Sequence, residues 1–267
     1  MPKDDAAPPA KRRGDARDGD IQAVSRCAQI LRMVADQQSV RASDVAVALG
    51  LQRSTAHRYL ASMAGAGLIE RGEDGGFVPG PLAVHLGSLA MRRARVLDIA
   101  GPYMSALAAE AHETVVLSLW GGSGAVVTRV AEDPTRLVNI SVREGGQLQP
   151  HAAQSQVFLA YLPEREQVRR LLSLQSPYIR EELEQSIENV RRTGFGAYST
   201  VVQGIHAVAA PIFDSRATIC ATLALVGTSD SLVAAPDSHL WQALGKVARK
   251  ISAQLGHTGT LPDTAGS

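Results

Sequence analysis

A short polar segment from Arg53 to Arg58, Arg-Ser-Thr-Ala-His-Arg, carries the side chains whose chemistry is clearest in this chain. Arginine can donate paired hydrogen bonds to a guanine edge or a phosphate, and hydroxyl and imidazole groups can bond either. On the exposed first half of a helix, such groups reach into the major groove of DNA. The alternative is an ordinary solvated helix face. We predict DNA contacts for five of these residues: Arg53, Ser54, Thr55, His57 and Arg58.

Two short helices joined by a glycine would position this segment. Apolar residues recur at three- and four-residue spacing at Val45, Ala46 and Leu49, and Gly50 supplies the left-handed residue that ends a helix. The second helix begins near Gln52, with an apolar face made of Ala56, Tyr59, Leu60 and Met63. An upstream amphipathic helix would complete the core with Val24, Ala28, Leu31 and Val34. This pattern is typical of a helix-turn-helix.

A β-hairpin is predicted directly after these helices. Residues 68–71 and 77–79 have the composition of short strands, and Glu-Asp-Gly-Gly at 73–76 is typical of a turn. A hairpin in this place is a wing, and we expect Arg71 on it to contact DNA as well. Residues 21–80 are therefore predicted to form a winged helix-turn-helix domain.

The charge of this domain favours an assembly of several chains. Residues 21–80 hold six arginines against five acidic residues, a net charge of +1, and the whole chain also nets +1. Non-specific affinity for DNA scales with the number of phosphates that are neutralised, so one copy would bind weakly. We therefore expect a homo-oligomer, a dimer or tetramer, that binds paired half-sites on double-stranded operator DNA.

Several other classes of protein are disfavoured. No apolar run approaches the roughly 18 residues of a membrane span, and the N-terminus is polar, so we expect a cytoplasmic protein without a membrane partner. Cys27 and Cys220 are too few for a disulfide framework or a zinc site. The glycines at 122 and 124 lack the third glycine of a dinucleotide loop, and the histidines lack ligand spacing. We expect no catalytic residue, metal or cofactor.

The rest of the chain predicts a second, mixed domain. Residues 81–95 would form a linker helix, residues 96–257 a sensing domain, and residues 1–20 and 258–267 tails without fixed structure. Strands are expected at 114–120, 125–130, 137–142, 207–213 and 218–226. Helices are expected at 96–111, 151–161, 164–172, 180–193 and 238–255. Short hairpins favour an antiparallel sheet with helices packed on it, so the fold class is α+β.

The sequence resembles the IclR family of bacterial transcriptional regulators over residues 21–255. The resemblance rests on segments in the family's order: Arg53–Leu60, Phe77–Leu82, Glu113–Val115, His151–Ala153, Arg192–Gly196 and Gly204–Asp214. It implies a winged helix-turn-helix followed by a GAF-like α/β domain that binds a small-molecule effector. Departures from the family occur at Gln52, where many members have proline, and at Arg41, where a hydroxyl residue is common.

Effector contacts are expected on the matched segments of the second domain. A sensing pocket is mostly apolar with a few polar groups. The candidates are Leu119, Val138, Gln154, Ser155, Gln156, Tyr198, Ser199, Ala224 and Val226, with Tyr198 and Ser199 placed on a loop. Because Ala224 and Val226 offer no donors where some acid-sensing relatives have serines, we expect an aromatic or hydrophobic acid or amide rather than a small polar acid.

A reading from another class remains open. The chain could be a small-molecule binding or modifying protein whose helix-turn-helix is vestigial, and specific binding to the promoter of its own operon would separate the two. The operator sequence, the effector, the regulated genes and the choice between repression and activation do not follow from the sequence.

Overall fold

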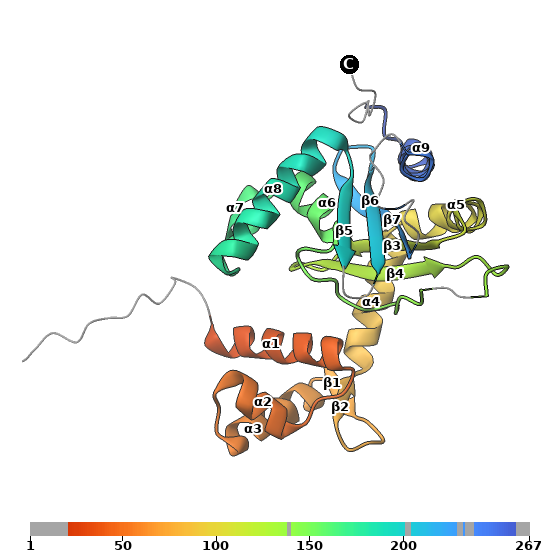
Figure 1. Cartoon of the computed structure of the whole chain (residues 1–267). Helices are drawn as coiled ribbons and strands as arrows, with labels where there is room; N and C mark the ends of the chain where they lie inside the picture. The colour runs from red at the N-terminus through yellow and green to blue at the C-terminus, as the bar shows by residue number, and fades with distance from the viewer. Residues whose placement is uncertain (1–20, 138–139, 201–203, 229–231, 233–237, 260–267) are drawn as a thin grey trace, which may run out of the picture. The chain divides into compact units, whose positions relative to one another are not determined.

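The computed structural model describes residues 21–137, 140–200, 204–228, 232 and 238–259. The chain divides into two compact units, residues 1–86 and 87–267. The predicted tail at 1–20, and all but two residues of the one at 258–267, lie outside the described residues. Figure 1 labels the helices and strands of both units.

The first unit is the predicted winged helix-turn-helix. It comprises α1 (Gln22–Gln37), α2 (Ala42–Leu49), α3 (Arg53–Gly65), β1 (Ile69–Arg71) and β2 (Phe77–Pro79). The two strands pair antiparallel and form the wing. A single core joins these elements and consists of Ile30, Val34, Val40, Val45, Ala56, Leu60, Met63, Ile69 and Phe77.

Helix ends in this unit follow from local chemistry. Gly50 adopts the left-handed conformation with φ of 60° and ends α2, as its position predicts. At the start of α2, the Asp44 carboxylate accepts a hydrogen bond of 3.0 Å from the Arg41 backbone N–H, which satisfies one free donor without a hydroxyl cap. On α1 the predicted face was wrong at Val24, which is 62% exposed, because α1 packs against the core only from Cys27 onward.

The second unit is a five-stranded sheet with helices on both faces. Its strands are β3 (Thr114–Trp120), β4 (Ala125–Ala131), β5 (Gly196–Thr200), β6 (Ile205–Phe213) and β7 (Ile219–Gly227). They lie in the order β4-β3-β7-β6-β5, and every pair is antiparallel. The helices are α5 (Val96–Ala111), α6 (Ala153–Tyr161), α7 (Arg165–Ser173), α8 (Pro177–Thr193) and α9 (His239–Gln254). The predicted α/β domain with an antiparallel sheet is confirmed.

Two hydrophobic cores lie on opposite faces of this sheet. Helices α5 and α9 cover one face, where Leu117, Leu223 and Leu225 meet Trp241. Helix α6 covers the other, where Val157 and Phe158 pack on residues that include Ala209 and Ala224. Figure 1 shows α8 alongside α6, on the α6 side of the sheet. Side chains alternate between the faces along each strand, so neighbouring residues of one strand belong to different cores.

Two local predictions for this unit were wrong. The segment 137–142 is not a strand at the positions that the structure describes; Leu137 is fully exposed, and the Ile140 carbonyl accepts a hydrogen bond from the Thr114 hydroxyl at 2.8 Å. Tyr198 and Ser199 lie not on a loop but on edge strand β5, where they pair with Ala207 and His206. Helix α4 (Pro81–Arg93) forms as predicted and contains the division between the units.

Candidate DNA-binding surface and ligand cavity

Helix α3 presents its polar residues to solvent because its apolar face is anchored in the core. Ala56, Leu60 and Met63 are buried, which fixes the rotation of the helix about its axis. The predicted residues exposed on it are Arg53, Ser54, His57 and Arg58. The fifth, Thr55, is half-buried at the edge of the core.

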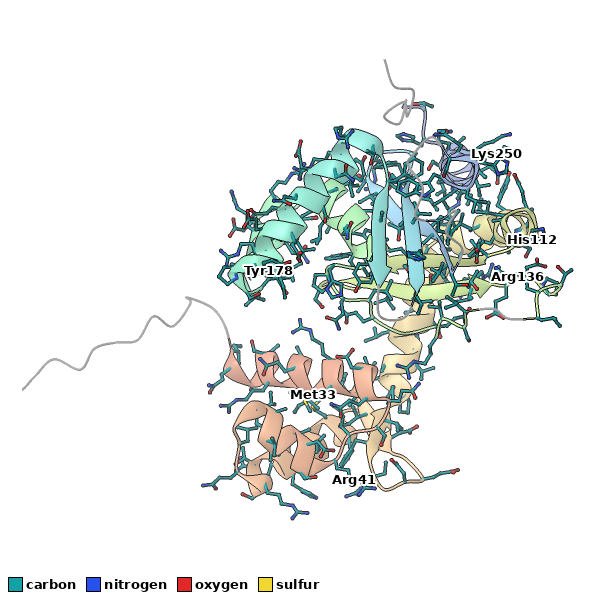
Figure 2. The ribbon with its side chains drawn as sticks, viewed as in Figure 1. Met33, Arg41, His112, Arg136, Tyr178 and Lys250 are labelled. Carbon is teal, nitrogen blue, oxygen red and sulfur yellow. The ribbon has the colours of Figure 1, made fainter. Side chains whose placement is uncertain are left out.

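Arg53, His57 and Arg71 come together around one hollow of about 430 Å³ in the winged unit. The other residues that line it come from the start of α2 and from the wing: Arg41, Ala42, Ser43, Asp74, Gly75 and Phe77. Figure 2 labels Arg41. Ser54 and Arg58 stand on α3 outside this hollow. Arg41 and Ser43 were not predicted to contact DNA, although their position at the start of the first helix of the motif could have suggested them.

The turn of the wing is organised by Asp74. Its carboxylate accepts hydrogen bonds from the Ser39 hydroxyl at 2.7 Å and from the Gly76 N–H at 3.0 Å. Both bonds lower the pKa of Asp74, and the bond from Ser39 contributes most. The carboxylate is therefore charged at neutral pH. The carboxylate therefore fixes the turn while it faces a cationic hollow.

Arg71 is held in place on the wing by two contacts. Its Nη1 donates to the Gly75 carbonyl at 2.8 Å, and its guanidinium carbon lies 4.8 Å from the centre of the Phe77 ring. An arginine fixed in this way loses little side-chain freedom when it meets a phosphate. Three arginines against one carboxylate give the hollow a positive charge that suits DNA.

The second unit contains a cavity of about 680 Å³. Its described lining comes from the segment before and within α6, from α8 and from β5: His151, Gln156, Ile179, Glu182, Leu183, Gln185, Ser186, Asn189, Ala197 and Tyr198. The rings of His151 and Tyr198 lie 5.0 Å apart at an angle of 40°. Gln156 donates from Nε2 to the His151 carbonyl at 2.7 Å, which ties the helix to the segment before it. Of the nine predicted effector residues, Gln156 and Tyr198 line this cavity.

Two neighbouring residues of α6, Gln154 and Ser155, form hydrogen bonds with buried groups of the sheet instead. Gln154 donates from Nε2 to the Val116 carbonyl at 3.2 Å and, more weakly, to the Thr222 carbonyl at 3.4 Å. Ser155 accepts a hydrogen bond of 3.1 Å from the Ala125 N–H. Both side chains are buried, so they fix α6 on the sheet and do not line the cavity.

The remaining predicted effector residues do not form one site. Leu119 packs with the core on the α5 side, whereas Ala224 is buried in the core on the α6 side, because alternation along the strands puts them on different faces. Val226 is half-buried on the same strand as Ala224. Ser199 is on β5, and Val138 lies outside the described residues.

A charged cluster joins the end of α5 to the loop after β4. Asp133 lies 2.6 Å from Nδ1 of His112, and that bond together with bonds from Thr135 lowers the pKa of Asp133 to about 2. Arg136 lies 2.9 Å from the Glu113 carboxylate and also donates to the His112 carbonyl. Burial outweighs this arginine and raises the pKa of Glu113. Figure 2 shows His112 and Arg136 close together. Each acid is paired, as expected of a structural cluster.

Within the described part of the chain, no group of histidine, cysteine and acidic side chains could hold a metal ion. Among the same residues, no helix is both long and apolar enough to cross a bilayer.

The family models for "Bacterial transcriptional regulator IclR C-terminal" and "IclR helix-turn-helix domain" match residues 88–253 and 23–73. The chain is 30% identical to the transcriptional repressor IclR of Escherichia coli K12 over 228 residues, which cover 78% of this chain and 81% of that protein.

Two solved structures share the fold. An IclR transcriptional regulator from Silicibacter sp. TM1040 superposes with a TM-score of 0.73 at 22% identity, covering 92% of this chain and all of that one. An IclR homologue from Microbacterium hydrocarbonoxydans, solved with 4-hydroxybenzoate, gives 0.61 at 23% identity, covering 88% and 99%. The chain belongs to the IclR family of bacterial transcriptional regulators, DNA-binding proteins that are not enzymes.

Proposed function

We propose that this regulator binds operator DNA as a cytoplasmic homo-oligomer, with α3 and the wing of each chain on one half-site, and that a small molecule bound to the second unit changes this affinity. The observation that carries the DNA contact is the hollow shared by Arg41, Arg53, His57 and Arg71. It combines the reading helix and the wing in one cationic surface, as a winged helix-turn-helix requires.

Helix α4 supports the proposed assembly. Leu82, Leu86 and Leu89 are 39%, 55% and 45% exposed and follow one another at spacings of four and three residues. This spacing is that of a helix–helix seam, and exposed apolar stripes of this kind mark interfaces. A second chain would cover the stripe and bring a second winged unit to the operator.

Two observations support an effector site in the second unit. The cavity beside α8 has the size of a small-molecule site, and it joins side chains of α6, α8 and β5. The Microbacterium homologue was solved in complex with 4-hydroxybenzoate, which is an example of an aromatic ligand bound to a protein of this fold. We propose an aromatic or otherwise apolar effector whose binding alters the spacing of paired winged units through α4.

Mutation of the reading helix tests the proposal. A binding site is first selected from random DNA with the purified full-length protein. Arg53→Ala and Arg58→Ala are each expected to reduce affinity for that site by about 1–3 kcal/mol, since each removes a base or phosphate contact. Arg169→Ala, an exposed arginine on α7, is the matched control and should leave affinity unchanged. Selection of no site, or unchanged affinity in both α3 variants, would favour a vestigial helix-turn-helix.

A further inference from the structure

We infer that the cavity beside α8 prefers a ligand with an apolar or aromatic body and a positively charged amine over one of the same body with a carboxylate. The inference rests on the proposed role of this cavity as the effector site and names the chemical class of the effector. Its basis is the charge, the hydrogen-bonding groups and the apolar surface of the described lining.

Glu182 determines the charge of the cavity lining. Among the described residues that line the cavity there is one carboxylate, Glu182, and neither lysine nor arginine. Glu182 is exposed at the rim of the cavity, so its charge is partly screened by water, and a ligand carboxylate beside it would be repelled only moderately. A ligand amine in the same place would pair with it. The charge of the lining therefore selects against acids.

An exposed tyrosine precedes Glu182 by one helical turn on α8. Interaction with Glu182 raises the pKa of Tyr178. Figure 2 labels Tyr178 near the start of α8.

One arginine of α8 is hydrogen-bonded to a residue of the lining. Arg192 donates from Nη2 to the Asn189 side-chain oxygen at 2.7 Å, and Asn189 itself lines the cavity. The guanidinium approaches the lining through this amide and does not line the cavity itself. An acidic ligand could recruit this guanidinium, so Arg192→Gln tests the opposite preference.

The apolar and neutral polar parts of the lining define the rest of the ligand. Ile179 and the buried Leu183 give α8 an apolar surface, and the half-buried Tyr198 ring faces the same cavity from β5. Such a surface suits an aromatic ring, and a tyrosine ring also attracts a cation. The side chains of Gln185 and Ser186 form no hydrogen bond with another described residue, so both can bond the ligand.

Three probes of the same size but different charge test this inference. Benzylamine, benzyl alcohol and benzoate are titrated at neutral pH into the full-length protein, and binding is followed by calorimetry and by ligand-observed NMR. Benzylamine is expected to bind at least about tenfold more tightly than benzoate. Glu182→Gln should remove most of that preference and leave benzyl alcohol unaffected. Glu181→Gln, the adjacent exposed acid outside the cavity, is the matched control and should change nothing.

The outcomes that contradict the ligand class differ from those that contradict the effector role. Benzoate that binds as tightly as benzylamine, a preference that survives Glu182→Gln, or no binding of benzylamine at millimolar concentration would overturn the inference. Benzoate binding that is lost in Arg192→Gln would show that the cavity selects acids. Binding of benzylamine that depends on Glu182 but leaves affinity for the selected DNA unchanged would uphold this ligand class and contradict the proposed effector role.

Discussion

Arginine side chains from three separate segments meet in the hollow of the winged unit, and each is positioned differently. Arg53 stands on the first turn of α3, Arg41 precedes α2, and Arg71 lies on the wing over Phe77. Bonds from Ser39 and Gly76 fix Asp74, which holds the turn that carries the wing. The position of the Arg71 guanidinium is therefore set before DNA arrives, which lowers the entropy lost on binding.

Arg71 is expected to contact a phosphate. Arg71→Ala should weaken binding to all DNA sequences about equally and reduce the slope of log affinity against log salt concentration by about one. Fluorescence anisotropy at several salt concentrations, on the selected site and on an unrelated duplex, measures both. Arg32→Ala on α1 is the control; a loss for Arg71→Ala that is confined to the selected site would show base reading instead.

Asp133 is expected to make stability depend on pH in the acidic range. Its pKa is lowered from 3.8 to about 2 in the folded chain, so its contribution is present above about pH 4 and is lost as pH falls toward 2. Asp133→Asn should therefore destabilise the second unit at about pH 5 and have a smaller effect at about pH 3. Urea unfolding followed by the fluorescence of Trp120 and Trp241 checks this. An effect that is constant over this range would contradict it.

The chemistry of single residues could be predicted from the sequence where it depends on local helix geometry. The exposure of Arg53 and His57 was predicted in this way, because a helix with a known apolar face has a known exposed face; their contact with DNA stays a prediction. Gln154 could not be assigned correctly, since its partners Val116 and Thr222 are 38 and 68 residues away and are set by the packing of α6 on the sheet. The polar side chain of Gln154 suggested contact with a ligand, whereas in the structure it donates hydrogen bonds to buried carbonyl groups.

At the scale of elements, the wing depends on a glycine that meets backbone. A Cβ on Gly80 would lie 2.5 Å from the Gly67 carbonyl oxygen and 2.8 Å from that of Ile69, so neither neighbour can move cheaply. Gly80→Ala is expected to destabilise the winged unit by about 1–3 kcal/mol. Hydrogen exchange of α3 amides measures this. Gly65→Ala, at an open helical position, is the control and should be neutral or mildly stabilising.

Helix α4 is expected to control assembly. Leu86→Asp places a charge in the middle of the exposed stripe, so it should shift the oligomer toward monomer by at least about tenfold in dissociation constant, because a buried unpaired charge is costly. Sedimentation velocity over a range of concentrations measures the shift. Ser88→Asp, on another side of the helix, should leave assembly unchanged. A wild-type chain that is already monomeric at micromolar concentration would contradict the proposed interface.

Elements were predictable where one period dominates the sequence and less so where tertiary contacts decide. The helix-turn-helix, both hairpin strands of the wing and four of the five sheet strands follow from periodicity and turn residues. The segment 137–142 alternates like a strand, yet its tie to the sheet is the Thr114 side chain. Strand β5 was not predicted because it is a short edge strand of five residues, too few to show a clear alternation.

The whole molecule consists of two units with separate cores, and we propose a separate task for each. The winged unit carries little net charge, so its affinity for DNA depends on a local cationic hollow and on the number of copies bound. The second unit supplies a cavity whose occupant can act only if it favours one arrangement of the paired winged units over another. We therefore propose that both functions depend on assembly into a homo-oligomer.

Hydroxyl-radical footprinting of the full-length protein on the selected DNA site tests most directly whether an oligomer binds paired half-sites. We expect two protected half-sites related by a pseudo-dyad, with centres separated by about 10 base pairs or a multiple of that spacing. Both should be lost together in Arg53→Ala at protein concentrations that saturate the wild-type site. Protection of a single half-site by a monomer, or a footprint unchanged in Arg53→Ala, would contradict the account.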